Sequence, residues 1–165
     1  MSSRTSLTGR ISRDLELTRP LLDRLPEAAL TWRPHPRSFT LAGLGTHIAR
    51  LPHWGAQLLA EDRHDLAAGG PSRPPLASRA EIVALFDRHV AEWHAALAAV
   101  DDARLDAPWT LLDDARVVET LSHTDALDRY LLHHLIHHRG QLTVYLRLLD
   151  VPLPALYGPT ADLRP

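Results

Sequence analysis

The sequence predicts an all-α protein, folded as a single four-helix bundle domain over residues 1–165. Three observations support this prediction. A length of 165 residues is typical of one domain. Four segments repeat apolar side chains at the interval of a helix, and the links between them are rich in proline and glycine, which end helices. Because isolated helices of this length are marginal in water, each must bury one face against the others.

The first two helices are expected at about residues 5–25 and 40–60. The polar, proline-rich link TWRPHPRS separates them, and Ser38 or Thr40 suits the N-cap of the second helix. The first helix repeats apolar side chains close to every seventh residue, at Leu7, Ile11, Leu15, Leu22 and Leu25.

The third helix is expected to open at Ser78, after the loop EDRHDLAAGGPSRPPLA. Ser78 and Glu81 form an S-x-x-E capping box, in which each side chain satisfies the other's backbone N–H. The fourth helix is expected at about 124–149, followed by an extended proline-rich tail. Two β-prone pieces around an Asp-Asp turn, within residues 101–121, leave a short hairpin between the third and fourth helices as an alternative.

Composition excludes several classes of function. The net charge is −2 and the arginines are scattered among acids, so nucleic-acid binding is not expected. No apolar run approaches the ~20 residues of a membrane span, and the N-terminus does not resemble a signal peptide, so we expect a cytoplasmic protein. Cysteine is absent, which excludes disulfides, thiolate-bound zinc and a protein thiol nucleophile. Any soft-metal chemistry must therefore use histidine.

The chain has eleven histidines, and their helical phase separates them. On the fourth helix, counted at 100° per residue from Leu127, His133 and His137 fall on the flank. The residues expected within about 60° of Leu127 are Leu131, His134, His138, Gln141, Leu142, Tyr145 and Leu149. On the second and third helices, His47 and His89 share a face with apolar residues.

Four histidines are thus expected to face the core. A single buried histidine is usually an inert, hydrogen-bonded core residue. Several neutral imidazoles in one small core each need a partner for their ring nitrogens, and one shared metal ion satisfies several at once. His134 and His138 are four residues apart and can converge on one ion. The glutamate of the zinc-protease motif is missing, so packing without metal remains an alternative.

Two stretches of the chain resemble the DinB-like family, whose DinB/YfiT-like members are metal-binding four-helix bundles. The C-terminal stretch is LLHHLIHHRGQLTVYLRLLDVPLPALYGPTAD, and the upstream stretch is LTWRPHPRSFTLAGLGTHIARLPHW. The resemblance implies that His47, His134 and His138 ligate one divalent metal ion, with zinc or nickel expected first. It assigns no ligand role to His89, which is expected to be a core or pocket-lining residue. Asp150 stands where such proteins often carry glycine, and aspartate tolerates the left-handed conformation needed there.

Three histidine ligands leave an open position on the ion, as in catalytic zinc sites. The resemblance therefore implies a metal-dependent enzyme, a thiol-dependent S-transferase or isomerase that acts with a low-molecular-weight thiol or another small molecule. A metal-binding stress-response protein without turnover is the alternative, and a purely structural bundle is a third. Gln141 and Tyr145 lie on the correct face to line the pocket.

The resemblance also implies a homodimer. His133, His137 and Val144 lie on the flank of the fourth helix and would suit a second buried face there. Arg139 lies off the apolar stripe, so we expect it to make a surface ion pair or a dimer contact.

Overall fold

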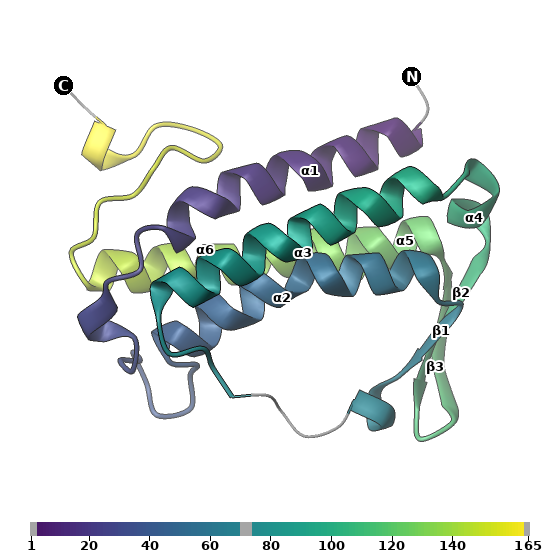
Figure 1. Ribbon diagram of the computed structural model, residues 1–165, viewed down its shortest axis with the longest axis horizontal. Coiled ribbons are helices and arrows are strands. Elements are labelled where there is room, and N and C mark those ends of the chain that lie inside the picture. The colour runs from purple at the N-terminus through teal and green to yellow at the C-terminus, as the bar shows by residue number, and fades with distance from the viewer. Residues whose placement is uncertain (1–2, 70–73, 164–165) are drawn as a thin grey trace.

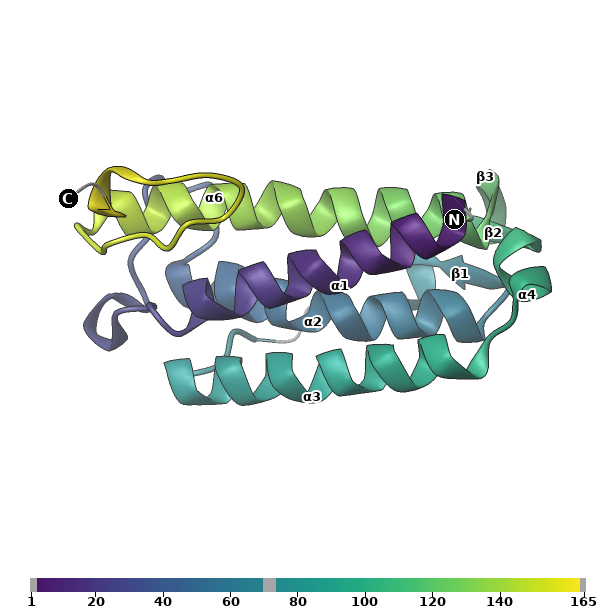
Figure 2. The ribbon, with the colours of Figure 1, turned by 90° about the horizontal axis from the view of Figure 1, so that it is seen from above.

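Four long helical segments lie side by side in the computed structural model, which describes residues 3–69 and 74–163 (Figures 1 and 2). The first three are α1 (Ser3–Leu22), α2 (Leu41–Ala60) and α3 (Arg79–Ala99). The fourth is a continuous helix of three parts, α5 (His123–Leu127), the π-helical η3 (Asp128–His133) and α6 (His134–Leu148). Both α2 and α1 pack against α3 and α6. The four predicted helices are therefore confirmed.

The predicted helix starts are visible as side-chain caps. Thr40 Oγ1 accepts a hydrogen bond from Gly43 N at 3.0 Å, and Ser78 Oγ accepts one from Glu81 N at 3.2 Å. The capping box at the start of α3 is shifted by one residue, because Glu81 Oε2 accepts from Ala77 N (3.0 Å). These bonds satisfy backbone donors that have no partner within the helix.

A small sheet at one end of the bundle shows that the fold is not purely all-α (Figure 1). Its order is β1 (Arg63–Asp65), β2 (Pro108–Asp113) and β3 (Arg116–Ser122). The hairpin alternative is confirmed by the antiparallel pair β2 and β3. The prediction of a loop was wrong at β1, which pairs parallel to β2. A strand of three residues is too short to show the alternation of apolar and polar side chains from which a strand is predicted. Residues 70–73 of that predicted loop lie outside the described residues.

The hairpin turn is stabilised by β1. Asp114 and Ala115 have positive φ values of 50° and 63°, as a two-residue turn between twisted strands requires. Their backbone N–H groups donate to the Asp65 carboxylate at 3.1 and 3.3 Å. Asp65 belongs to a strand that the sequence did not predict. Its side chain therefore stabilises the turn of the hairpin that the sequence did predict.

The connections add short helical turns, which are η1 (Glu27–Ala29), η2 (Leu66–Gly69), α4 (Asp102–Asp106) and η4 (Ala161–Leu163). Beyond α6 the chain is extended, as predicted, with Asp150 in the left-handed region at φ 56°. Arg147 ties the tail back to the bundle by donating to the Asp162 carboxylate at 3.0 and 2.5 Å. None of the helices in the described ranges is long and apolar enough to cross a membrane.

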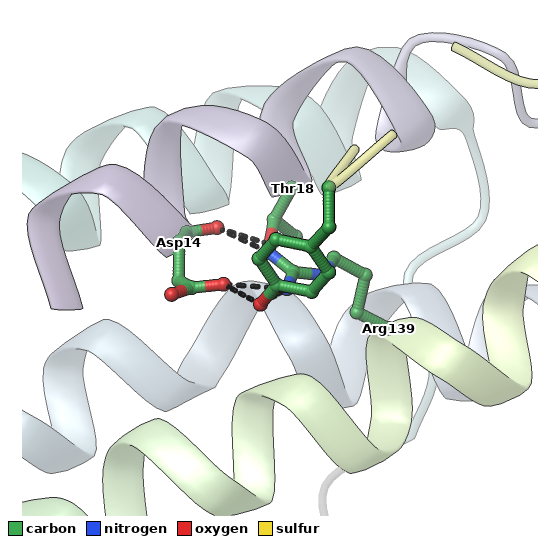
Figure 3. Close-up of polar contacts among 4 residues, drawn as sticks. Asp14, Thr18 and Arg139 are labelled. Carbon is green, nitrogen blue, oxygen red and sulfur yellow. Dashed lines mark hydrogen bonds and ion pairs between the residues drawn. The ribbon is translucent and has the colours of Figure 1, made fainter. Parts of the chain in front are cut away.

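The prediction that Arg139 makes a surface ion pair or a dimer contact was wrong, because this residue is only 1% exposed. It lies between α6 and α1 (Figure 3). Its guanidinium donates to the Asp14 carboxylate at 2.5 Å and to the Asp14 backbone oxygen at 2.9 Å. It also donates to Thr18 Oγ1 at 3.4 Å. The Tyr157 hydroxyl, from the C-terminal tail, also contacts Arg139 and Asp14. Arg139 is thus a buried link between the two helices and the tail.

The π-helical segment explains this error. A π-helical turn holds one residue more than an α-helical turn, so the residues beyond it are rotated by about 100° relative to a regular helix counted through it. Counting from Leu127 crosses η3 and so assigns Arg139 to the surface, although Leu142 and Tyr145 are buried as predicted. The most buried line of α6 is formed by Leu135, Arg139, Leu142 and Leu146. His134 and His138 are consequently turned toward α2.

Candidate metal centre

Three histidines from two helices meet at one point between α2 and α6. His47 lies on α2, and His134 and His138 lie one turn apart at the start of α6. The Nε2 atom of His134 is 3.1 Å from Nε2 of His47 and 2.9 Å from Nε2 of His138. Two nitrogens that share one ion at ~2.0–2.1 Å lie about 2.9–3.4 Å apart for bond angles of about 90–110°. The observed spacing fits a shared ion.

The tautomer of His138 supports the same conclusion. Its Nδ1–H donates to Gln141 Oε1 at 2.8 Å, so its Nε2 carries a lone pair. That lone pair faces Nε2 of His134, whose imidazole is also hydrogen-bonded to the backbone of Tyr130. Metal-binding histidines typically use their second N–H in this way. A cation among the three Nε2 atoms would satisfy all of them together.

The electrostatic environment keeps these imidazoles neutral. Burial is the first cause that lowers the pKa of each of the three rings, and the neighbouring histidines lower it further. The pKa of His47 falls to about 4. At neutral pH all three rings therefore offer lone pairs rather than N–H⁺ groups, which is the state that a metal ion requires.

The surroundings differ on the two sides of the centre. On one side the Phe39 ring stacks on His47 at 5.7 Å and meets His138 edge-on at 6.1 Å. Behind Phe39 lies a surface pocket of about 350 Å³ that Arg37, Ser38 and Gln141 help to line. On the other side His47 and His134 themselves form part of the wall of a pocket of about 330 Å³.

The sequence profile of the DinB superfamily matches residues 10–142. The chain belongs to the DinB superfamily. A DinB-like protein from Bacillus subtilis has the same fold, with a TM-score of 0.72 at 17% identity over 93% of this chain and 99% of that one. A DinB-like protein from Bacillus cereus gives a TM-score of 0.70 at 21% identity, over 92% and 95% of the two chains. No curated protein matches the sequence.

The described part of this DinB-superfamily chain holds a second group with metal-ligand chemistry, formed by His53, His89 and Glu92. Two of its three members, His53 and Glu92, already bind each other. The His53 ring donates from Nδ1 to Glu92 Oε2 at 2.7 Å, and buried His89 donates from Nδ1 to Ala49 O at 2.8 Å. The group also lies at the surface, where His53 and Glu92 are 47% and 41% exposed and form an ordinary ion pair when His53 is protonated. The three-histidine group is the better candidate.

The other residues that the sequence singled out lie partly in the core and partly at the surface. His89 is a core residue, as expected for a DinB-like chain. Gln141 orients His138, whereas Tyr145 is buried and donates to Phe39 O at 3.3 Å. His133 and His137, together with Val144, are exposed on the outer face of the fourth helix, and their predicted role in a dimer stays a prediction.

Sequence reasoning missed the residues that enclose the site. Phe39 precedes α2 in a loop, and no periodicity predicts that its ring covers two histidines. Leu111 and His64 reach the 330 Å³ pocket only because β1 pairs with β2. Trp54 is different, because it lies seven residues after His47 on α2, and this spacing places it on the same helix face.

Proposed function

We propose that this DinB-superfamily protein is a divalent-metal-dependent enzyme that joins a low-molecular-weight thiol to an electrophilic small molecule or isomerises such a molecule with the thiol's help. The observation that carries the proposal is the convergence of three neutral Nε2 atoms beside an apolar pocket, whose wall includes His47 and His134. Three protein ligands leave a position open for a substrate atom. The chain has no cysteine, so the sulfur must come from a small molecule.

His47, His134 and His138 would hold the ion, and imidazole ligands make zinc or nickel the first choices. When bound, such an ion supplies a positive charge that lowers the pKa of a thiol placed beside it, so that a thiolate exists at neutral pH. In the transfer the sulfur forms a bond to the electrophilic carbon. The leaving group departs with the bonding electron pair, and the thiol proton passes to solvent.

The protein's own residues perform supporting tasks. Gln141 Oε1 holds the Nδ1–H of His138 at 2.8 Å and so orients its lone pair inward. Phe39 covers His47 and His138 on one side and keeps water from that face of the rings. Burial holds the pKa of each ligand imidazole below its ordinary value, so protons do not compete for the site at neutral pH.

Metal content tests the first half of the proposal. Elemental mass spectrometry of the untagged protein should find about one zinc or nickel ion per chain, and the His47→Ala/His134→Ala/His138→Ala variant should contain none. The Glu92→Gln variant is the matched control, because it alters the other histidine group and should keep the ion. Absence of metal after reconstitution of a folded protein would leave a bundle in which the histidines only pack.

Turnover tests the second half. Metal-loaded protein is incubated with glutathione, bacillithiol or mycothiol and a chromogenic electrophile, and thioether formation is followed. The proposal expects a rate well above that of the His138→Ala variant with the same thiol. Equal rates for the two proteins would contradict it.

One observation favours a second candidate, a metal-binding stress-response protein without turnover. Among the described residues, neither pocket beside the centre is lined by an aspartate or glutamate that could act as a general base. This candidate predicts stoichiometric, tight metal binding with no rate for any thiol. A substrate-dependent rate that is lost with the metal would exclude it.

A further inference from the structure

The 330 Å³ pocket touches the candidate metal centre directly. His47 and His134 belong both to the ligand group and to the pocket wall. The rest of the wall comes from elements far apart in the sequence, with Trp54 on α2, Leu66 on η2, Leu111 on β2 and Tyr130 on η3. The small sheet and the π-helical segment therefore each form part of the pocket wall.

The wall is apolar and aromatic. Trp54 meets His64 edge-on at 4.4 Å and Trp109 at 6.4 Å, so its ring is held by packing. The hydroxyl of Tyr130 is already used, because it donates to Glu119 Oε1, and this carboxylate also accepts from Arg129 at 2.7 Å. The Tyr130 ring thus faces the pocket as a neutral surface.

Little in this wall could recognise a polar body. No carboxylate, amide or hydroxymethyl side chain is among the described lining residues. Of the described residues in the wall, Arg50 alone carries a permanent charge, and its guanidinium donates to Pro74 O at 3.3 Å. Burying polar groups without partners costs free energy, so the polar body of a thiol such as glutathione is disfavoured here. Polar side chains gather instead in the hollow behind Phe39.

We infer that this pocket binds a compact, uncharged, mainly aromatic group of the substrate, directly beside the ion held by His47 and His134. A volume of about 330 Å³ is at the small end of ligand pockets, which suits one ring with a short side chain. The inference rests on the proposed function and adds the substrate class: the electrophilic partner is small and apolar, and its reactive atom lies at the ion end of the pocket.

Thiol binding to the cobalt-loaded protein tests the inference without turnover. Coordinated sulfur gives Co²⁺ a charge-transfer absorption band, and two thiols of similar acidity serve as probes, phenylmethanethiol and 2-mercaptoethanol. Because only the first carries a ring to bury, it should bind about 10- to 100-fold more tightly. The Leu66→Trp and Leu111→Phe variants, which fill the pocket from its mouth and from the sheet, should remove this preference. In these variants the affinity for 2-mercaptoethanol should stay within about twofold of that of the unaltered protein.

The matched control is Leu148→Trp, because Leu148 is exposed to a similar degree (58% against 55% for Leu66) but lies on α6 away from the pocket. It should keep the full preference. Equal affinities for the two thiols would overturn the pocket assignment and leave the proposed function standing. The same holds if both pocket variants still bind phenylmethanethiol more tightly than 2-mercaptoethanol. No band with either thiol on the cobalt-loaded protein would overturn both.

Discussion

Removal of the Asp14 carboxylate should destabilise the protein far more than loss of an ordinary ion pair. Asp14 and Arg139 have side chains only 8% and 2% exposed, so solvent cannot replace the lost charge. In Asp14→Ala the guanidinium keeps its bonds to the backbone oxygen of residue 14 and to Thr18, but it loses its counter-charge, and the Tyr157 hydroxyl loses its acceptor. Breaking a buried pair in this way costs about 3–5 kcal/mol.

Urea unfolding followed by circular dichroism measures this loss as a change in the free energy of unfolding. For a protein of this size the loss corresponds to a fall in Tm of about 6–20 °C. Arg10→Ala is the control, because Arg10 and Asp128 are 3.5 Å apart with side chains 57% and 34% exposed. Such a pair contributes about 0–1 kcal/mol.

A second variant separates buried charge from lost packing. Asp14→Leu/Arg139→Met replaces both charges by apolar groups of similar volume and should recover most of the stability that Asp14→Ala loses. If Asp14→Ala cost no more than Arg10→Ala, the description of Arg139 as a buried link between α1, α6 and the tail would be wrong.

Two further predictions concern pH and packing. The metal-free protein should lose stability as the pH falls from about 6.5 toward 4, since the pKa values of His47, His89 and His123 are lowered in the folded state mainly by burial, and the unfolded chain therefore binds protons first. Urea unfolding at pH 7, 6 and 5 should show a slope of up to about 1.4 kcal/mol per pH unit for each histidine, and a flat profile would contradict this. Gly55→Ala should destabilise by about 1–3 kcal/mol, because a Cβ at Gly55 would lie 3.0 Å from Trp93 Cε3 and closer still to Leu131. Gly9→Ala, where a Cβ meets nothing within 4 Å, should instead be neutral or stabilising by up to about 1 kcal/mol, and equal effects in thermal unfolding would refute the packing argument.

The helices and the inward orientation of the three candidate ligand histidines could be predicted because both depend on local patterns. Helical phase brought His134 and His138 to one face, since they are four residues apart, and it put His47 on the apolar face of α2. Phase failed at Arg139, because the π-helical segment rotates the chain between the reference residue and α6. Spacings counted within α6 alone could have predicted that Arg139 is buried, because it lies four residues after Leu135 and three before Leu142.

Periodicity and composition were enough to predict the four helices and the inward-facing histidines and to exclude a protein thiol, because each depends on residue type or on spacings within one helix. The sheet, the burial of Arg139 and the pocket beside the centre depend on contacts between segments far apart in the chain. Asp65 binds the turn at Ala115, Asp14 binds Arg139, and Leu111 and His134 line the same pocket. Such arrangements leave no repeat in the sequence, so only the packed tertiary structure determines which side chains surround the three histidines.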